Sequence, residues 1–437
     1  MKTKKLHKDI VNITTLGCSK NMVDSEVLSG QLLANGIDVK HESPKLNYNI
    51  SIINTCGFID KAKEESVNTI LEHVALKEEG QLDKVYVTGC LSERYKNDLE
   101  EEIQGVDAWF GTMELPNILK AFEADYKAEL VGERLLSTPS HYAYLKISEG
   151  CNRTCSFCAI PLMRGKHVSK SIEDIIIEAK GLVKKGVKEI MLIAQELTYY
   201  GLDIYKERKL PELLERLSEV EGIEWIRLHY AYPHKFPMEI LEVMKAKANI
   251  CNYLDMPLQH ISDNMLTAMK RQITRQEIFD LIQDIRKVIP DICLRTTLIA
   301  GFPGETKEDI EDVKSFLEEV KFDRVGVFTY SHEEGTSGYA LNDNLSQEEK
   351  EARAQDIMDT QIDISLAKNQ EKIGKVFKVI IDKKEAGRYI GRTEFDSVEV
   401  DNEVIIPSKK KLVIGDFVQV KITKAYDFDL EGEVVYA

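Results

Sequence analysis

The stretch "YAYLKISEGCNRTCSFCAIP", residues 142–161, places three cysteines directly after a segment typical of a β-strand. Cys151, Cys155 and Cys158 follow the spacing C-x3-C-x2-C. Their thiolates are soft ligands that favour iron–sulfur clusters or zinc. Three thiolates on one tight loop can hold three corners of a [4Fe–4S] cube and leave its fourth iron open, and an open position is typical of chemistry rather than structural support. The alternative is a zinc knuckle that borrows a distant ligand such as His167.

The strand before these cysteines is the first of six in residues 137–367. The segments that follow are "EIMLIA", "WIRLHY", "NYLDM", "ICLRTTLIA" and "RVGVFTY". Amphipathic helices separate them, such as the one over 171–186, where Ser171 and Asp174 have the spacing of a capping box. Strands that alternate with helices indicate βα units. Six units predict an open, partial (βα)6 barrel rather than a complete eight-stranded one.

The segments on either side differ in pattern. Residues 9–125 alternate short β-rich runs with helical stretches, which predicts a parallel α/β sheet. A polar helical stretch over 346–374 leads to residues 370–437, where short strands with Gly and Asp turns predict a small, OB-like β-barrel. The sequence thus predicts an α/β protein with three domains, at 9–125, 137–367 and 370–437.

Three further cysteines occupy one kind of position in the amino-terminal domain. Cys18, Cys56 and Cys90 each end a predicted parallel strand. Ligands bind at the carboxyl edge of open α/β sheets, so these thiols are expected to converge although they lie far apart in the chain. They predict a second cluster with an open iron; the alternative is three buried thiols. Cys251 and Cys293 have no partner at ligand spacing and are expected to be ordinary core residues.

Composition and charge limit the expected cellular location and the expected binding partners. The 437 residues are 43% hydrophobic and 30% charged, as in an ordinary globular protein, and no apolar run approaches the roughly 20 residues that span a bilayer. The basic start lacks a signal-peptide core, so a cytoplasmic location with reduced cysteines is expected. The net charge of −16 argues against broad capture of a polyanion. It favours a basic partner or reflects solubility alone.

The cysteine spacing after the first barrel strand resembles the radical S-adenosylmethionine superfamily. The whole chain is similar to its methylthiotransferase family, with an amino-terminal domain, a radical core and a terminal TRAM module. The motifs that carry the resemblance are "TLGCSKN", "NTCGFI", "EGCNRTCSFCAIP", "RGK", "YLDMPLQH" and "GFPGET".

The resemblance implies the insertion of a methylthio group into a C–H bond. Two [4Fe–4S] clusters are then expected, one on Cys18, Cys56 and Cys90 and the other, which binds S-adenosylmethionine, on Cys151, Cys155 and Cys158. One S-adenosylmethionine donates the methyl group and another supplies the radical, while the amino-terminal cluster carries the sulfur. No catalytic residue beyond the cluster ligands is expected. The reaction also implies an electron donor and a sulfur source.

Several other residues are candidates for contact with the cofactor. Gln195 follows the second barrel strand, where the superfamily places polar groups against the S-adenosylmethionine amino group; the alternative is a polar loop residue. Arg295 could pair with the cofactor carboxylate or form a structural ion pair. Arg164 and Lys166 follow the cluster loop and are expected to contact substrate or cofactor, the alternative being an exposed basic turn.

Two pairs of residues carry weaker signals. Gln259 and His260 end a strand-like run and could line the pocket, although a lone histidine is more often simply hydrogen-bonded. Gly301 and Gly304 permit close backbone approach or positive φ.

Two branches of the family compete for the substrate: one modifies a tRNA adenosine, and the other the β-carbon of an aspartate in protein twelve of the small ribosomal subunit. Residues 370–437 carry 12 Lys and Arg against 13 Asp and Glu, and "EFDSVEVDNE" has five carboxylates, whereas a tRNA-binding module should be basic. An acidic tail suits a basic ribosomal protein, free or within the ribosomal subunit. "CAIPLMRGK" and "WIRLHYAYP" also look like that branch, although Glu196 and Leu197 depart from its usual Asp and Thr. A rival of another class is a metal-stabilised RNA-binding protein without catalysis.

Overall fold

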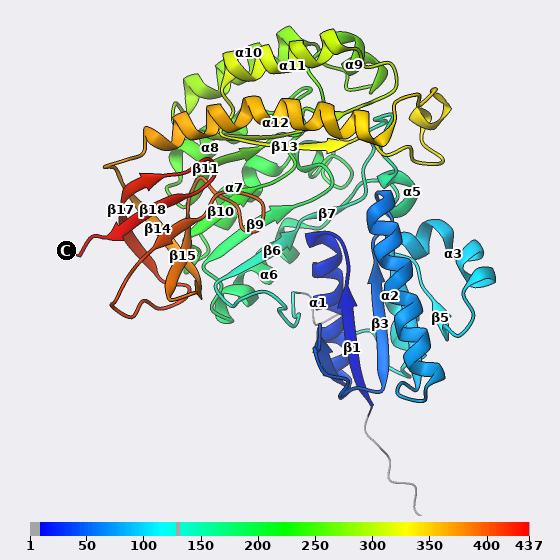
Figure 1. Ribbon diagram of the computed structural model, residues 1–437. Helices are drawn as coiled ribbons and strands as arrows, with labels where there is room; N and C mark the ends of the chain where they lie inside the picture. The colour runs from blue at the N-terminus through cyan, green and yellow to red at the C-terminus, as the bar shows by residue number, and fades with distance from the viewer. Residues whose placement is uncertain (1–8, 128–131, 437) are drawn as a thin grey trace, which may run out of the picture. The chain divides into compact units, whose positions relative to one another are not determined.

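The computed structural model describes residues 9–127 and 132–436, which form two compact units (Figure 1). The first contains the described residues up to Thr138 together with Tyr144–Asn152 and Ala159–Gly181. The second contains Pro139–Ala143, Arg153–Cys158 and the chain from Leu182 onward. Within the described ranges, no helix has the length and apolar character needed to cross a bilayer.

The amino-terminal sheet has five parallel strands in the order β2-β1-β3-β4-β5, which confirms the predicted parallel α/β fold. Apolar side chains of the strands alternate between its two faces, so that Ile52 packs in one core and Ile53 in the other. The strands are β1 (Ile10–Thr15), β2 (Asp38–His41), β3 (Ile50–Thr55), β4 (Lys84–Gly89) and β5 (Ala108–Trp109). The helices are α1 (Ser19–Ala34), α2 (Asp60–Glu78), α3 (Cys90–Glu102) and α4 (Leu115–Ala121).

The central sheet has six strands in the order β13-β12-β11-β10-β9-β6, which confirms the predicted partial barrel. Its strands are β6 (Tyr142–Lys146), β9 (Glu189–Ile193), β10 (Trp225–Leu228), β11 (Ile250–Asp255), β12 (Cys293–Ala300) and β13 (Arg324–Thr329). The accompanying helices are α5 (Ile160–Arg164), α6 (Ile172–Lys184), α7 (Leu210–Ser218), α8 (Glu239–Ala246), α9 (Asp263–Ala268), α10 (Arg275–Val288), α11 (Lys307–Val320) and α12 (Gln347–Gln370). A two-stranded ribbon joins β7 (Ser148–Glu149) to β8 (Val168–Ser169).

Side-chain caps explain where several of these helices begin. Thr274, Thr306 and Ser346 each form a reciprocal capping box at the start of α10, α11 and α12. Ser171 accepts a hydrogen bond from the Asp174 N–H at 3.1 Å, in line with the predicted start of α6. Each cap satisfies backbone N–H groups that the first helical turn would leave without a partner.

The carboxyl-terminal strands close into a five-stranded barrel in the order β14-β15-β16-β18-β17. Its strands are β14 (Val376–Glu385), β15 (Arg388–Thr393), β16 (Val404–Ile406), β17 (Phe417–Ala425) and β18 (Leu430–Val434). The first four were predicted from the sequence. The barrel has its own core, which includes Val379, Ile381 and Val420.

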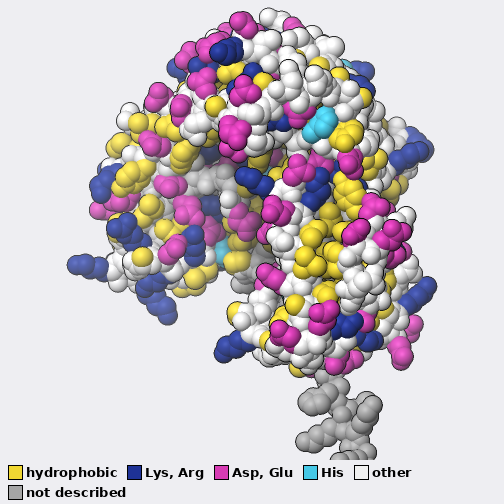
Figure 2. Space-filling view, turned by 45° about the vertical axis from the view of Figure 1, so that its right-hand side comes forward, with side chains coloured by type: hydrophobic (Ala, Val, Ile, Leu, Met, Phe, Trp, Pro, Cys, Tyr) yellow, Lys and Arg dark blue, Asp and Glu magenta, His cyan; other side chains and the backbone are white. Residues whose placement is uncertain are grey.

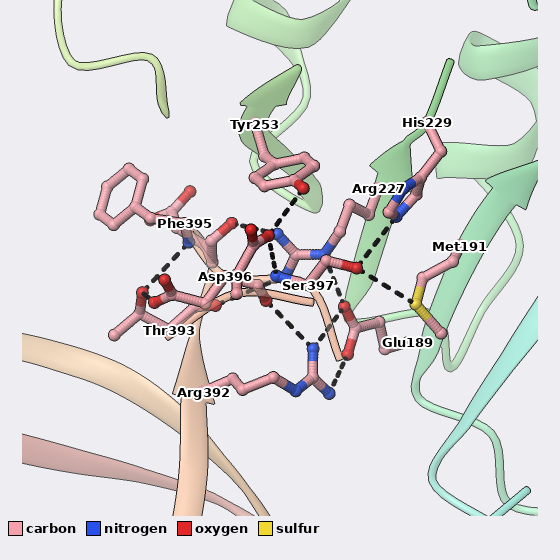
Figure 3. A network of polar contacts seen from close by, with 12 residues as sticks. Glu189, Met191, Arg227, His229, Tyr253, Arg392, Thr393, Phe395, Asp396 and Ser397 are labelled. Atoms are coloured by element: carbon pink, nitrogen blue, oxygen red, sulfur yellow. Dashed lines mark hydrogen bonds and ion pairs between the residues drawn. The ribbon is translucent and has the colours of Figure 1, made fainter. Parts of the chain in front are cut away.

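The barrel packs against the six-stranded sheet through an apolar layer and a buried polar network. Cys251 and Cys293 are buried in the apolar layer with Trp225 and Ile380, as expected of ordinary core thiols. Figure 3 shows the network, in which Arg227 and Arg392 both reach the carboxylate of Glu189. Because Glu189 and Arg227 come from the sheet and Arg392 from the barrel, this network joins the two parts of the second unit.

The surface combines both signs of charge. On the face drawn in Figure 2, Asp and Glu side chains are interspersed with Lys and Arg, and the described residues there form no broad basic area. Such a surface fits the formal net charge of −16.

Candidate metal centres

The three amino-terminal cysteines lie where neighbouring strands end. Cys18 follows β1, Cys56 follows β3 and Cys90 follows β4, and these strands are adjacent in the sheet. The pairs Thr15–Asn54 and Thr55–Gly89 are in register, so the three strands end at nearly the same level. The thiols therefore share one edge of the sheet, as the sequence predicted from the position of each cysteine at the end of a strand.

Glycines allow the cysteine loops to approach closely. A Cβ on Gly17 would lie 2.7 Å from Cys56 Sγ, and a Cβ on Gly57 would lie 2.8 Å from the Leu91 backbone, next to Cys90. Gly17 also has a φ of +90°, which L side chains rarely adopt. These positions require glycine because the backbone lies against the Cys56 side chain at Gly17 and against the Leu91 backbone at Gly57.

Electrostatics couples the three thiols. Burial raises the pKa of Cys90 to about 11, opposed by the positive charge of Arg164 and reinforced by Cys18 and Cys56. Burial likewise raises the pKa of Cys56, and Cys18 contributes to that shift. Cluster binding would release the thiol protons, since the thiolate is the ligand.

A polar shell surrounds Cys90. Arg164 Nε donates to Cys90 Sγ at 3.3 Å, and its guanidinium also pairs with Asp24 at 2.6 Å and Glu149 at 3.2 Å. Lys146 contacts both carboxylates. The burial of Arg164 against a cysteine of the amino-terminal trio contradicts the alternative of an exposed basic turn, while its contact with substrate or cofactor stays a prediction.

The second trio spans the loop after β6 and β7. Cys151 donates its N–H to the Gly165 carbonyl at 3.1 Å. Cys158 donates its N–H to the Cys155 carbonyl at 3.2 Å, which closes a tight turn between them. Arg271 Nη1 donates to Cys155 Sγ at 3.2 Å. All three cysteines of this trio are partly exposed.

An aromatic and charged cluster lies beside Cys155. The Arg153 guanidinium packs over the rings of Tyr199 and Tyr232, 4.1 and 3.8 Å from their centroids, and pairs with Glu196 at 2.9 Å. Glu196 also accepts from the Thr198 N–H. Glu196, a departure from the family pattern, therefore holds an arginine of the cysteine loop in place.

The chemistry of the donor sets fits iron–sulfur clusters. Within residues 9–127 and 132–436, no group of three His, Cys, Asp or Glu side chains is arranged to hold a single metal ion. A cube is larger than one ion, so its ligand sulfurs lie farther apart than those of a mononuclear site. Two sets of three thiolates match what such clusters bind. His167, the candidate zinc ligand, contacts Ser169 Oγ at 3.1 Å through Nε2.

Gln195 and Arg295 lie in different surroundings. Gln195 is half-buried just after β9, at the carboxyl edge expected to face the cofactor. Arg295 forms ion pairs with Asp255 at 3.1 Å and Asp401 at 3.2 Å, beside a cavity of about 140 Å³ that Asn402 also lines. These pairs favour the structural alternative for Arg295, while its cofactor contact stays a prediction.

The weaker candidates have structural roles in the second unit. His260 Nδ1 accepts from the Ile261 and Ser262 N–H groups at 2.9 and 3.0 Å, so it is hydrogen-bonded, as expected of a lone histidine. Gln259 pairs by its backbone with β12. Gly301 and Gly304 both have positive φ, which the sequence anticipated.

Sequence reasoning did not single out three of these contacts. Arg153 lies within the cysteine motif, so its position in the sequence could have identified it as a neighbour of the cysteines. Tyr232 and Arg271 gave no such signal, because each lies in a loop that only the folding of the six-stranded part brings to Cys155.

Three segments match known protein families. Residues 145–317 match the Radical SAM superfamily, residues 373–435 match the TRAM domain, and residues 10–111 match the uncharacterized protein family UPF0004.

Similar proteins cover the whole chain. Proteins named "Ribosomal protein uS12 methylthiotransferase RimO" from Flavobacterium johnsoniae and Flavobacterium psychrophilum are 60% and 61% identical, with 99% of this chain and 100% of each relative covered. The protein of that name from Phocaeicola vulgatus is 54% identical over 98% of this chain and its own full length.

Solved structures share the fold. The radical S-adenosylmethionine methyltransferase TsrM from Kitasatospora setae matches with a TM-score of 0.54 at 14% identity, over 73% of this chain and 72% of its own. The cobalamin-dependent S-adenosylmethionine radical enzyme OxsB matches with a TM-score of 0.52 at 14% identity, over 76% of this chain and 55% of its own.

Proposed function

The chain belongs to the ribosomal protein uS12 methylthiotransferase RimO family, and we propose that it places a methylthio group on ribosomal protein uS12. The observation that carries the proposal is the 60% identity that extends over nearly the full length of both chains. The strand-end placement of Cys18, Cys56 and Cys90 adds support from the structure.

Each cysteine trio has its own task in this proposal. Cys151, Cys155 and Cys158 hold a [4Fe–4S] cluster that binds S-adenosylmethionine, and the amino-terminal trio holds a second [4Fe–4S] cluster that carries sulfur. When bound, S-adenosylmethionine and the cluster supply the radical that removes hydrogen from an unactivated carbon. The chain's own part is to hold the thiolates, orient Arg153 through Glu196 and present Gln195 at the edge where the cofactor is proposed to bind. No side chain needs to act as a general base, because a hydrogen atom rather than a proton is removed.

The proposed acceptor is the β-carbon of an aspartate in uS12. The charge argument for a basic protein substrate is weaker than the sequence suggested. Asp396 and Asp401, two of the five carboxylates in "EFDSVEVDNE", are buried in ion pairs with Arg324 and Arg295. They therefore add little to an acidic face, and the choice of uS12 over tRNA rests on the relatives. The proposal further includes a cytoplasmic setting, an electron donor and a sulfur source.

Mass spectrometry of the substrate tests this function. The protein is reconstituted anaerobically with iron and sulfide and incubated with S-adenosylmethionine, a reductant, and either ribosomal proteins or tRNA. We expect one methylthio group on an aspartate of uS12, absent when Cys155 is replaced by alanine. Methylthiolated tRNA with unmodified uS12 would instead support the tRNA branch, and no modification of either by a cluster-loaded protein would favour a binding module.

A further inference from the structure

The side chain of Arg164 is directed at a sulfur atom of the amino-terminal trio. Its Nε lies 3.3 Å from Cys90 Sγ, and the residue is only 5% exposed. An arginine stays charged at any ordinary pH. A permanent cation is therefore buried beside a proposed cluster ligand.

Three neighbours fix the direction of this guanidinium. Nη1 donates to Asp24 at 2.6 Å and to Glu149 at 3.2 Å, and Nη2 contacts the Asn21 side-chain oxygen. These partners occupy both terminal nitrogens, which leaves Nε facing Cys90. The fork geometry of arginine makes such an arrangement rigid, and lysine cannot reproduce it.

The backbone around Arg164 is equally constrained. Helix α5 packs on Cys90, since Ala159 and Met163 form a buried cluster with it. Gly165 follows with a φ of +69°, and its carbonyl accepts the Cys151 N–H at 3.1 Å. Consecutive residues thus contact one cysteine of each trio: Arg164 through its side chain, and Gly165 through its backbone.

We propose that Arg164 is a positioning residue that raises the reduction potential of the amino-terminal cluster through its hydrogen bond to Cys90. Hydrogen bonds to ligand sulfurs and nearby positive charge are among the factors that set cluster potentials, because both stabilise the more negative, reduced state. This inference rests on the proposed function, in which the amino-terminal trio holds a cluster. Gly165 contributes by holding the Arg164 backbone against the Cys151 loop.

The competing explanation is a buried ion pair that only supports the fold. Asp24 and Glu149 alone would account for a paired arginine, and breaking such a pair destabilises a protein strongly. A structural role predicts lost stability with no change in cluster potential. Reduction potential is therefore the property that separates the two explanations.

The test uses the full-length chain with Cys151, Cys155 and Cys158 replaced by alanine, so that only the amino-terminal cluster can form. Redox titration followed by electron paramagnetic resonance compares this parent with Arg164→Gln and Arg164→Lys. The control is Arg94→Gln, which removes an arginine that donates to the Gly57 carbonyl near the same loops.

At the midpoint potential of the parent, we expect the ratio of oxidised to reduced cluster to rise about tenfold in Arg164→Gln, which is about 59 mV for a one-electron couple. Arg164→Lys should give a rise of about threefold, because it keeps the charge and loses the directed hydrogen bond. Arg94→Gln should change the ratio less than about twofold.

Each result is decisive. Unchanged ratios in both Arg164 variants would overturn the proposal. If Arg164→Gln does not hold its cluster, the test rests on Arg164→Lys alone: a rise of about threefold in the ratio of oxidised to reduced cluster supports the proposal, and an unchanged ratio overturns it. A parent that binds no iron would instead refute the amino-terminal cluster itself, which is a failure of the proposed function rather than of the role of Arg164.

Discussion

Replacing Glu189 with glutamine tests how strongly the carboxyl-terminal barrel is attached to the six-stranded sheet. Glu189 is fully buried and accepts from Arg227 Nε at 2.9 Å and from Arg392 Nη2 at 2.7 Å (Figure 3). The substitution keeps the shape of the side chain and removes its charge. Two buried guanidinium groups then lose their shared counter-ion.

The expected loss of stability is about 3–5 kcal/mol, the usual cost of removing one partner from a buried ion pair. A matched control lies at the same junction. Glu224 pairs with Lys378 at 2.8 Å, but these side chains are 51% and 41% exposed. Glu224→Gln should therefore cost about 0–1 kcal/mol.

Tryptophan fluorescence reports this junction directly. Trp225 is buried there, with its ring centroid 4.8 Å from that of Phe417. The chain has 2 tryptophans, so Trp109→Phe leaves Trp225 as the only one. Urea unfolding in that background should show the large loss for Glu189→Gln and the small one for Glu224→Gln. Equal losses, or a loss below about 1 kcal/mol for Glu189→Gln, would refute this explanation of how the barrel is attached.

Further predictions concern pH, the second cluster and a glycine. Burial raises the pKa values of Glu189 and Asp396, but the charges of neighbouring arginines reverse this, so both lie below their ordinary values of 4.5 and 3.8. The ionised carboxylates stabilise the fold fully above the ordinary pKa values, and this contribution is lost as the pH falls through the lowered pKa values. The midpoint of urea unfolding, followed by Trp225 fluorescence, should therefore move to lower urea concentrations below about pH 4.5. Arg271→Met removes the hydrogen bond to Cys155 Sγ and should raise the oxidised-to-reduced ratio of the second cluster about tenfold, measured with the amino-terminal trio replaced by alanine; an unchanged ratio would contradict this. Gly301→Ala places a Cβ 2.3 Å from a lysine side-chain carbon at a φ of +81° and should cost about 1–3 kcal/mol in thermal unfolding, whereas a neutral effect would show that the loop relaxes.

The sequence predicted well what depends on local pattern. The six strands of the partial barrel follow apolar runs, and Cys18, Cys56 and Cys90 each follow a strand of the parallel amino-terminal sheet. Because parallel strands present their carboxyl ends at one edge, convergence of the thiols could be expected without coordinates. The role of all six cysteines as ligands stays a prediction.

Several short strands were not predicted from the sequence. β2, β5 and β18 have 4, 2 and 5 residues, and only pairing with neighbouring strands makes them strands. Equally short strands such as β10 ("WIRL") and β16 ("VII") were predicted because they are rich in apolar residues, whereas "DVKH" and "LEGEV" consist mainly of polar residues or Gly.

Contacts between distant charges were also beyond a single sequence. The carboxylates of Asp396 and Asp401 were counted as part of an acidic surface, yet their arginine partners lie 72 and 106 residues away in the chain. Arg164 likewise meets Cys90 across 74 residues. Only the folded chain brings these groups together, so composition could suggest a surface charge but not its burial.

Iron and sulfide content tests the central claim, that two separate trios of cysteines each hold a four-iron cluster. The intact chain and two triple alanine variants, one for each trio, are reconstituted anaerobically and analysed for iron and acid-labile sulfide. We predict about eight irons per intact chain and about four in each variant, as expected for two [4Fe–4S] clusters. Loss of the amino-terminal trio without loss of iron would contradict the claim.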